Sequence, residues 1–122
     1  MSIEAKLAEC MDIDGALAVA LVDGSSGMAI ATGGNPRNID LNIAAAGNCN
    51  VLKAKQSTMK DLGLEDEIED ILITTTSQYH LVRPLTDSSG KGLFVYLLLD
   101  KAKGNLAMAR FKLGRIEKDL TV

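Results

Sequence analysis

Two stretches of this sequence are apolar or aromatic at every position, and they set the layers of any fold the chain can adopt. Residues 16–22 and 93–99 have the length of β-strands, and neither alternates between apolar and polar residues. Because successive side chains of a strand point to opposite faces of its sheet, both faces of these two strands must be covered. We therefore expect them in the middle of a sheet that carries helices on both faces.

Three further stretches have the composition of less buried strands. Residues 27–32 are short and rich in alanine, so we place them at an edge of the sheet. Residues 71–76 are β-branched almost throughout, and the threonines at their end indicate a half-exposed edge strand. Residues 79–85 form another strand, which ends near Pro84 because proline has no amide hydrogen to donate. The sequence thus predicts five strands.

Three stretches read as helices. The first follows Ser2, a favourable N-cap residue, and ends near Asp14 and Gly15. The second is long, from residue 40 to residue 62, and Gly63 stands just past its end, where helices commonly have glycine. The first and third helices repeat apolar residues at steps of three or four, at Ile3, Leu7 and Met11 and at Leu106, Ala109, Leu113, Ile116 and Leu120.

The order of these elements defines the fold class. A helix, two strands, a helix, three strands and a helix follow one another, and neither run of strands needs a crossover connection. We therefore predict an α+β fold in which a five-stranded antiparallel sheet has helices on both faces, in the order α-β-β-α-β-β-β-α. A chain of 122 residues that is 47% hydrophobic is expected to form one domain, here residues 1–122.

The long middle helix has two faces that both differ from a solvated surface. With about 100° per residue, its larger apolar residues gather on one side, which we expect to meet the sheet. The opposite side carries small or uncharged side chains, where a solvated helix normally carries Lys and Glu. Gly47 on this side costs about 1 kcal/mol of helix propensity relative to alanine. We favour a helix–helix contact with a second subunit over a tolerated glycine on a bland surface. The sheet-facing positions are Leu41, Ala45, Leu52, Met59 and Leu62, and the opposite positions are Ile43, Ala46, Gly47, Asn50, Ala54 and Ser57.

Two glycine-rich loops raise the question of phosphate binding. They read DGSSGM at residues 23–28 and DSSGKG at residues 87–92. A phosphate loop of the Walker type needs G-x-x-x-x-G-K-[ST] between a strand and a helix, because the helix supplies its first amides to the phosphate. Here Gly92 replaces the Ser or Thr, the first glycine is missing, and both loops precede strands. Hairpin turns are therefore the favoured interpretation.

Composition argues against binding to nucleic acid and against membrane insertion. The net charge is −3, and two Phe, two Tyr and no Trp offer no platform on which bases could stack. No apolar stretch approaches the ~20 residues of a membrane span, and no basic-then-apolar leader opens the sequence. We expect a cytoplasmic protein with no nucleic-acid partner and no membrane span.

The residues that usually carry catalysis are few and scattered. Cys10 and Cys49 have no His or Cys at ligand spacing, so we expect two reduced thiols and no metal site. His80 is the one histidine, and a surface histidine is favoured over a general base. The sequence therefore predicts no catalytic residue and no cofactor site.

The chain resembles the roadblock / dynein light-chain domain family over nearly its whole length. Three segments carry the resemblance. They are IDGALAVALVDGSSGMAIA at residues 13–31, LGLEDEIEDILITTTSQYHLVRPL at residues 62–85 and GLFVYLLLDKAKGNLAMARFKL at residues 92–113. In the family an apolar strand leads through Gly-Asn-Leu into the last helix, and Gly104, Asn105 and Leu106 match this pattern. The family's fold, a five-stranded antiparallel sheet between helices, agrees with the prediction above.

The resemblance also implies how the protein assembles. Family members dimerise through the long middle helix and the edge of the third strand, so that two sheets join. This assigns the small-residue helix face to a homodimer interface together with Ile71, Ile73 and Thr75. A bare strand edge invites pairing in any case, and a twofold interface would bring Gly47 close to its own copy.

Adaptors and regulators of small Ras-like GTPases make up the family, and some bacterial members activate a polarity GTPase. The leading hypothesis is therefore a homodimeric, non-catalytic module that binds such a GTPase or a related signalling protein. The arginines available for a charged contact are Arg37, Arg83, Arg110 and Arg115, and for each we favour a structural role. The alternatives are a small-molecule sensor that binds its ligand on the sheet face, and an enzyme that uses His80.

Overall fold

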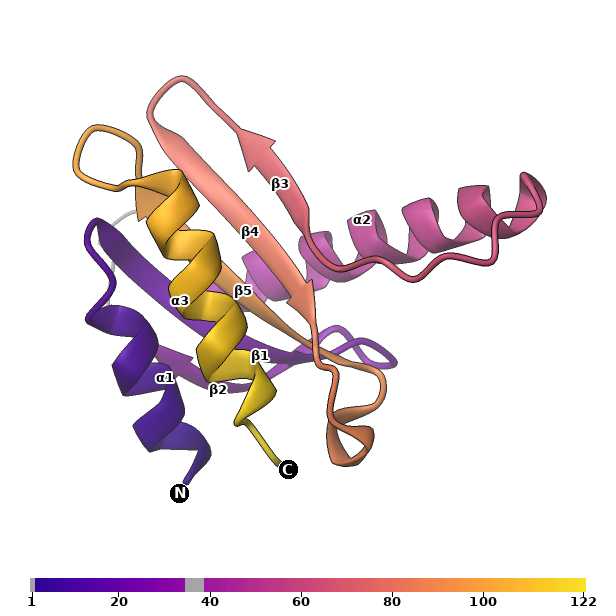
Figure 1. Ribbon diagram of the computed structural model, residues 1–122, viewed down its shortest axis with the longest axis horizontal. Helices are drawn as coiled ribbons and strands as arrows, with labels where there is room; N and C mark the ends of the chain where they lie inside the picture. Colours follow the sequence, from indigo (N-terminus) through magenta and orange to yellow (C-terminus); the bar gives the residue numbers. More distant parts are fainter. Residues whose placement is uncertain (1, 35–38) are drawn as a thin grey trace.

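The structure is a computed structural model that describes residues 2–34 and 39–122. Figure 1 shows helices on two sides of one twisted sheet, with the N- and C-termini at the same end of the molecule. The described elements are α1 (Ile3–Met11), β1 (Ala16–Asp23), β2 (Met28–Gly33), α2 (Leu41–Asp61), β3 (Ile71–Thr74), β4 (Gln78–Pro84), the short 3₁₀ helix η1 (Ser88–Gly90), β5 (Leu93–Asp100) and α3 (Leu106–Lys118). Apart from η1, this is the order expected from the sequence.

The sheet has five antiparallel strands in the order β2-β1-β5-β4-β3. β1 and β5 lie next to each other in the middle, with Ala20 opposite Tyr96. The two stretches that are apolar on both faces are thus the central strands, as predicted. The stretches placed at edges, β2 and β3, are the two edge strands. β3 therefore has a strand neighbour on one side only.

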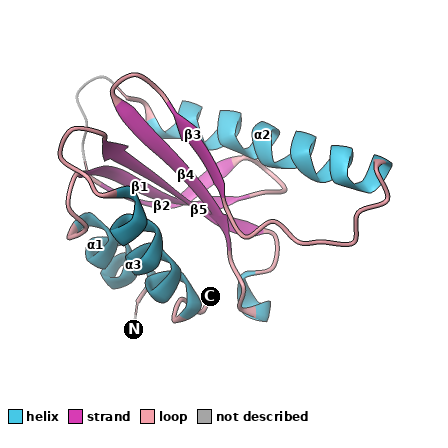
Figure 2. Ribbon diagram, turned by 45° about the horizontal axis from the view of Figure 1, so that its top comes forward, coloured by secondary structure: helices cyan, strands magenta, loops and turns pink. Residues whose placement is uncertain are grey.

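Helices cover the two faces of the sheet in different ways. α1 and α3 pack side by side on one face, where Leu7 and Leu113 join Val19 and Leu97 in a continuous apolar layer. α2 lies on the other face, where Ala45 and Cys49 pack in one layer with the alanines of β1. Figure 2 shows these three layers. The small side chains on this face of β1 let α2 lie close to the sheet. The five-stranded antiparallel sheet and the helices on both of its faces confirm the predicted fold class.

The long helix differs from its predicted form at its C-terminal end. Asp40 is the N-cap, and its carboxylate accepts from the amides of Asn42 and Ile43 at 2.9 Å and 3.4 Å. Gly63 has a φ of +73° just past the end of the helix, as expected. Leu62, however, is 66% exposed and does not face the sheet, so that part of the prediction is wrong. The reason is that α2 extends beyond the edge of the sheet (Figure 1).

The two glycine-rich loops connect antiparallel strands. In the first, the Asp23 carboxylate accepts from the Ser25 amide at 2.9 Å and from the Ser25 hydroxyl at 2.8 Å. In the second, Asp87 accepts from the amide of Ser89 at 2.8 Å and caps η1. These hydrogen bonds lower the pKa of both aspartates. The two aspartates thus bind serines of their own loops, and the loops are hairpin connections as predicted.

Two further observations concern membranes and metals. In the described part of the chain, every helix is too short or too polar to cross a lipid bilayer. Residues 2–34 and 39–122 also contain no group of three or more His, Cys, Asp or Glu placed to hold a metal ion. Cys10 and Cys49 are free and buried, and burial raises the pKa of Cys10 to about 12.

Candidate functional site

The side of α2 that faces away from the sheet is exposed along its whole length. We call this surface the outer face of α2, and it consists of Ile43, Ala46, Gly47, Asn50, Ala54 and Ser57. Ile43 is 72% exposed, the highest exposure among the large apolar side chains of the described residues. The residues of α2 that are buried, Ala45, Cys49 and Leu52, lie on the sheet side. The sequence pattern therefore separates the two faces correctly as far as Leu52, whereas Met59 and Leu62 do not join the layer packed on the sheet.

Gly47 lies at the middle of this outer face in open space. A Cβ atom built on Gly47 would have no atom within 4 Å apart from its own helix. The glycine is therefore not required by packing inside the protomer. Beyond Leu52 the helix leaves the sheet, and residues 53–61 are exposed except for Met59. Figure 1 shows this part of α2 projecting past β3 into solvent.

β3 presents an open edge near the outer face of α2. Ile71 is half-buried under the α2 layer, whereas Ile73 is 38% exposed. Both belong to a strand that pairs with β4 alone. An edge strand with apolar residues is a surface to which another strand can add.

Thr75 lies just past β3 and not within it. The strand was expected to continue to residue 76, but it ends at Thr74. The amide of Thr75 donates to the carbonyl of Gln78 at 2.9 Å, and its hydroxyl accepts from the amide of Gln78 at 3.0 Å. These bonds close the turn between β3 and β4. Thr75 is exposed, at the end of the same edge as Ile73.

His80 is half-buried, which corrects the expectation of a surface histidine. Its Nδ1 atom lies 2.8 Å from the hydroxyl of Tyr96, and its Nε2 atom lies 3.1 Å from Oε1 of Gln78. Burial lowers the pKa of His80 and raises the pKa of Tyr96 to about 12. Both ring nitrogens are thus held by groups of the protein. The arrangement ties β4 to β5 and does not present the imidazole as a free base.

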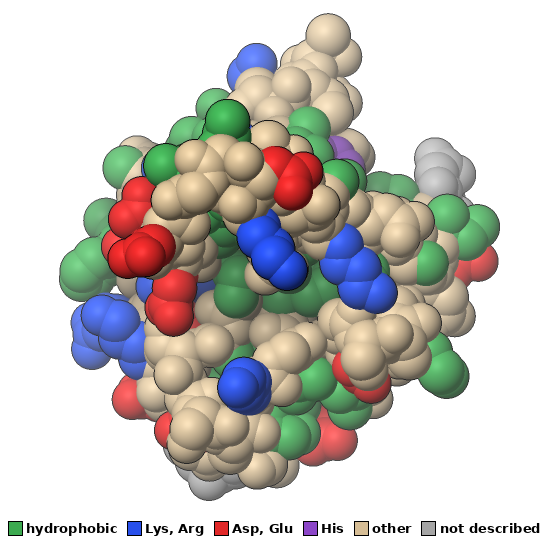
Figure 3. Space-filling model, turned by 90° about the vertical axis from the view of Figure 1, so that its right-hand side faces the viewer, with side chains coloured by type: hydrophobic (Ala, Val, Ile, Leu, Met, Phe, Trp, Pro, Cys, Tyr) green, Lys and Arg blue, Asp and Glu red, His purple; other side chains and the backbone are tan. Residues whose placement is uncertain are grey.

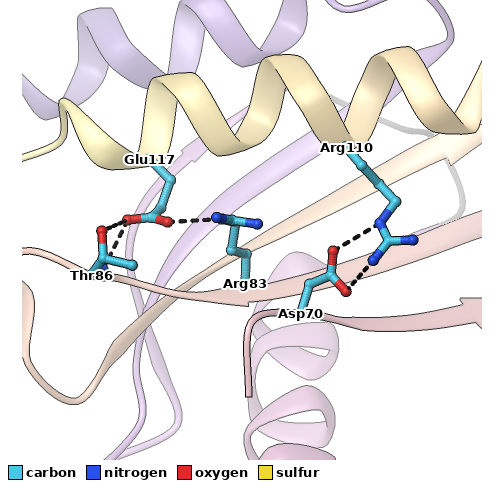
Figure 4. A network of polar contacts seen from close by, with 5 residues as sticks. All are labelled: Asp70, Arg83, Thr86, Arg110 and Glu117. Carbon is cyan, nitrogen blue, oxygen red and sulfur yellow. Dashed lines mark hydrogen bonds and ion pairs between the residues drawn. The ribbon is translucent and has the colours of Figure 1, made fainter. Parts of the chain in front are cut away.

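A buried carboxylate that the sequence did not reveal joins α3 to the end of β4. Glu117 is 1% exposed, and one of its oxygens accepts from Nε of Arg83 at 2.8 Å. Its other oxygen accepts from the amide and the hydroxyl of Thr86, at 2.8 Å and 2.7 Å. Figure 4 shows Glu117 between these two partners. Glu117 lies four residues after Leu113 and three before Leu120, so helical spacing puts it on the apolar side of α3, and its partners from β4 and the segment after β4 satisfy the buried carboxylate.

The four arginines named above have different surroundings. Arg110 of α3 makes a two-pronged ion pair with Asp70, through Nη2 at 2.7 Å and Nε at 2.9 Å (Figure 4). Arg83 is bound to Glu117, and Arg115 lies over the ring of Phe111, 5.8 Å from the ring centre. Arg37 lies outside the described residues. Arg83 and Arg110 therefore hold α3 against the β3–β4 side of the sheet.

Comparison with solved structures assigns the fold. It is the fold of roadblock/LC7 domains, as the sequence resemblance implies. MglB of Myxococcus xanthus superimposes with a TM-score of 0.84 at 19% identity, covering 98% of this chain and 84% of that chain. A Roadblock/LC7 domain from Streptomyces avermitilis gives a TM-score of 0.80 at 12% identity, over 97% of this chain and 93% of that chain. An MglB with a tetrameric arrangement gives 0.75 at 20% identity, over 94% and 87%.

Sequence comparison adds nothing to this assignment. No protein-family model matches the chain, and a search of curated proteins finds no significant match. At identities of 12–20%, the structural likeness shows a shared fold. The partner and the assembly of this chain must be argued from its own surface.

Proposed function

We propose that this protein is a homodimeric, non-catalytic adaptor of the cytoplasm, which binds a small Ras-like GTPase or a related signalling protein. The observation that carries the proposal is the exposed outer face of α2 beside the open edge of β3. Together with Ile71, Ile73 and Thr75, the outer face of α2 forms what we call the candidate interface. A surface of this kind is incomplete in a single protomer.

A twofold dimer would place each part of the candidate interface against the same part of its partner. Two β3 edges would pair, extending one sheet into the other, and two α2 helices would meet across the same axis. The small side chains around Gly47 would let the two helix backbones approach closely. Ile43 and Ile73 would supply the apolar area that such an interface buries. The part of α2 beyond the sheet would then lie over the partner.

Two considerations support a partner-binding role over catalysis. The fold is shared with MglB and with a Roadblock/LC7 domain, and the family that the sequence resembles consists of adaptors and GTPase regulators. Within the described residues, the one histidine is bound on both sides by Tyr96 and Gln78. A dimer without chemistry of its own would act on a GTPase by holding its mobile segments.

The proposal is tested by titrating the purified protein against the small GTPases encoded near its gene. Binding is followed by calorimetry with the GDP- and GTP-bound forms, and GTP turnover is followed in parallel. We expect saturable binding that depends on the bound nucleotide. Absence of binding to every such GTPase, together with unchanged turnover, would contradict the GTPase part of the proposal.

A further inference from the structure

The two helices that share one face of the sheet carry surface charges of opposite sign. On α1 and its C-cap, the exposed and half-exposed charges are the carboxylates of Glu4, Glu9 and Asp12. The side chain of the one lysine of α1, Lys6, is only 11% exposed. The hollow in Figure 3 differs, because lysines and acidic residues line it together. The surface of α1 is therefore negative.

α3 presents positive charge beside α1. Lys112, Arg115 and Lys118 are exposed, and none of them takes part in an ion pair among the described residues. Asp119, the C-cap, is the one exposed carboxylate of α3 and its caps. The unpaired cations of α3 therefore outnumber its exposed carboxylate, and the surface of this helix is positive.

A cleft of about 270 Å³ between α1 and α3 brings the two signs to the same height along the helices. Glu9 and Asp12 line it from α1 and its C-cap, and Lys112 and Arg115 line it from α3. No ion pair joins these carboxylates to these cations in the described part of the chain. The four groups thus lie side by side on the surface and remain available to charges of another molecule.

Apolar side chains lie exposed on the same face. Met108 and Phe111 of α3 are 49% and 60% exposed, and the guanidinium of Arg115 lies 5.8 Å from the ring centre of Phe111. With about 100° per residue, Phe111 points away from the side of α3 that faces the sheet. α1 exposes the small side chain of Ala8. Large apolar groups on α3 and a small one on α1 would fit together if one helix lay on the other.

We propose that the α1–α3 face binds the same face of a second copy of this chain, with α1 of each copy against α3 of the other. This inference goes beyond the proposed function and does not depend on it. A twofold axis parallel to the helices exchanges the two helices at the same height, so that Glu9 and Asp12 meet Lys112 and Arg115 of the partner subunit. An axis across the helices would place α1 on α1 and α3 on α3, and like charges would repel. The charge pattern therefore selects one of the two twofold arrangements.

The contact is small and sensitive to salt. α3 has 13 residues and is about 20 Å long, and with a width of about 10 Å per helix the two helices offer about 400 Å² per protomer. The total of about 800 Å² is below the roughly 1,200 Å² at which stable interfaces begin. Association through this face therefore requires concentrated protein and low salt. α2 lies on the opposite face of the sheet, so the candidate interface stays free and is the contact that persists in dilute solution.

The test is sedimentation equilibrium of the whole chain at high protein concentration. It compares about 0.1 M with about 1 M salt, between which the Debye length falls from about 10 Å to about 3 Å. The variant Lys112→Glu/Arg115→Glu makes both helices negative, and Glu9→Lys/Asp12→Lys makes both positive. The quadruple variant that combines them exchanges the signs of the two helices and keeps the net charge at −3.

The matched control is Lys53→Glu/Lys91→Glu. It makes the same charge change as the first variant, on α2 and in the β4–β5 connection, at residues that do not line the cleft. Circular dichroism verifies that each variant folds. The reference for each protein is its own mass at about 1 M salt, whether that is the mass of a monomer or of a dimer formed through α2. Failure of the proposed dimer is thus recognisable separately.

We expect the masses of the wild type, the control and the quadruple variant to rise toward twice the reference at about 0.1 M salt. Each two-residue variant should associate at least about ten-fold more weakly. An equimolar mixture of the two-residue variants restores the same charge pairs, so it replaces the quadruple variant if that chain does not fold. A wild type with the same mass at both salt concentrations, an equal loss in the control, or no recovery after the exchange of signs would overturn the proposal.

Discussion

Ile73 of β3 lies directly opposite His80 of β4, so a half-buried imidazole stands beside an apolar side chain on an open sheet edge. The hydroxyl of Tyr96 holds the ring from the other side, at 2.8 Å. A partly buried titratable group thus adjoins the candidate interface. This relationship links the stability of the edge to pH.

We predict that the protein loses stability when the pH falls below the ordinary pKa of histidine. Because burial lowers the pKa of His80 in the folded protein, the unfolded chain takes up the proton first as the pH falls through 6.5. The free energy of unfolding should therefore decrease below this value and be nearly constant from there to about pH 8, above which the Cys10 thiol begins to ionise in the unfolded chain. Urea unfolding at several pH values checks this. His80 is the one histidine, so His80→Gln should flatten the curve between about pH 7 and 5.5. If the free energy of unfolding of His80→Gln falls with pH as steeply as that of the wild type, a group other than His80 causes the loss.

Ile73→Lys should convert the dimer into a monomer without unfolding it. The side chain is 38% exposed in the protomer, so lysine fits there, but a charge on the β3 edge opposes strand addition. Sedimentation velocity measures the assembly state. Ile30→Lys is the matched control, since Ile30 is 49% exposed on the other edge strand, β2. If Ile30→Lys loses the dimer and Ile73→Lys keeps it, the interface lies at the β2 edge and the prediction is wrong.

Gly47 offers an independent test on the helix. Gly47→Ala should keep the dimer and favour the helix by up to about 1 kcal/mol. Gly47→Glu adds bulk and charge at the centre of the outer face of α2, and a protomer with open space there accepts it. We expect this variant to fold, by circular dichroism, and to sediment as a monomer. An unchanged sedimentation coefficient for Gly47→Glu would refute the helix contact.

Glu117→Ala should destabilise the protein by about 3 kcal/mol, because it leaves the largely buried charge of Arg83 without its partner and Thr86 without an acceptor. Urea unfolding measures the loss. The double variant Arg83→Met/Glu117→Leu removes both charges and should recover much of that stability. A loss below about 1 kcal/mol in the single variant would show that the pair contributes little.

The ion pair between Arg110 and Asp70 should contribute less to stability than the pair between Arg83 and Glu117. Arg110 is about half exposed, so Arg110→Ala is expected to reduce the free energy of unfolding by no more than about 1 kcal/mol. The effect should shrink further in high salt, which screens exposed charges. A loss as large as that of Glu117→Ala would mean that the pair with Asp70 is structurally essential.

The sequence predicted the layers of helices and sheet, because a strand buried on both faces has apolar residues at consecutive positions. Residues 16–22 and 93–99 could only be central, and the threonines after Ile73 marked an edge. The exposure of Leu62 escaped prediction because it depends on the width of the sheet, and no periodicity within the helix reports that width. The high β propensity of Thr75 predicts a strand residue, but its hydrogen bonds with Gln78 place it in the turn after β3.

The candidate site was predictable to different degrees. The outer face of α2 followed from helical spacing, since every one of its residues is exposed where the pattern places it. Helical spacing places Glu117 within the apolar stripe of α3, four residues after Leu113 and three before Leu120, but its partner Arg83 is distant in sequence, so the ion pair itself was not predicted. His80 was misjudged for the same reason, since Tyr96 comes from another strand. Contacts between remote segments decide the burial of such polar groups.

The portion of α2 past the sheet has a consequence for how association could be observed. Residues 53–61 gain almost no support from the protomer's core, and a helical stretch of that length is marginal in water by itself. Amide hydrogens there should exchange with solvent faster than those near Ala45, and a bound twin should slow them. The terminal turns of this helix would then report, residue by residue, whether the chain is alone.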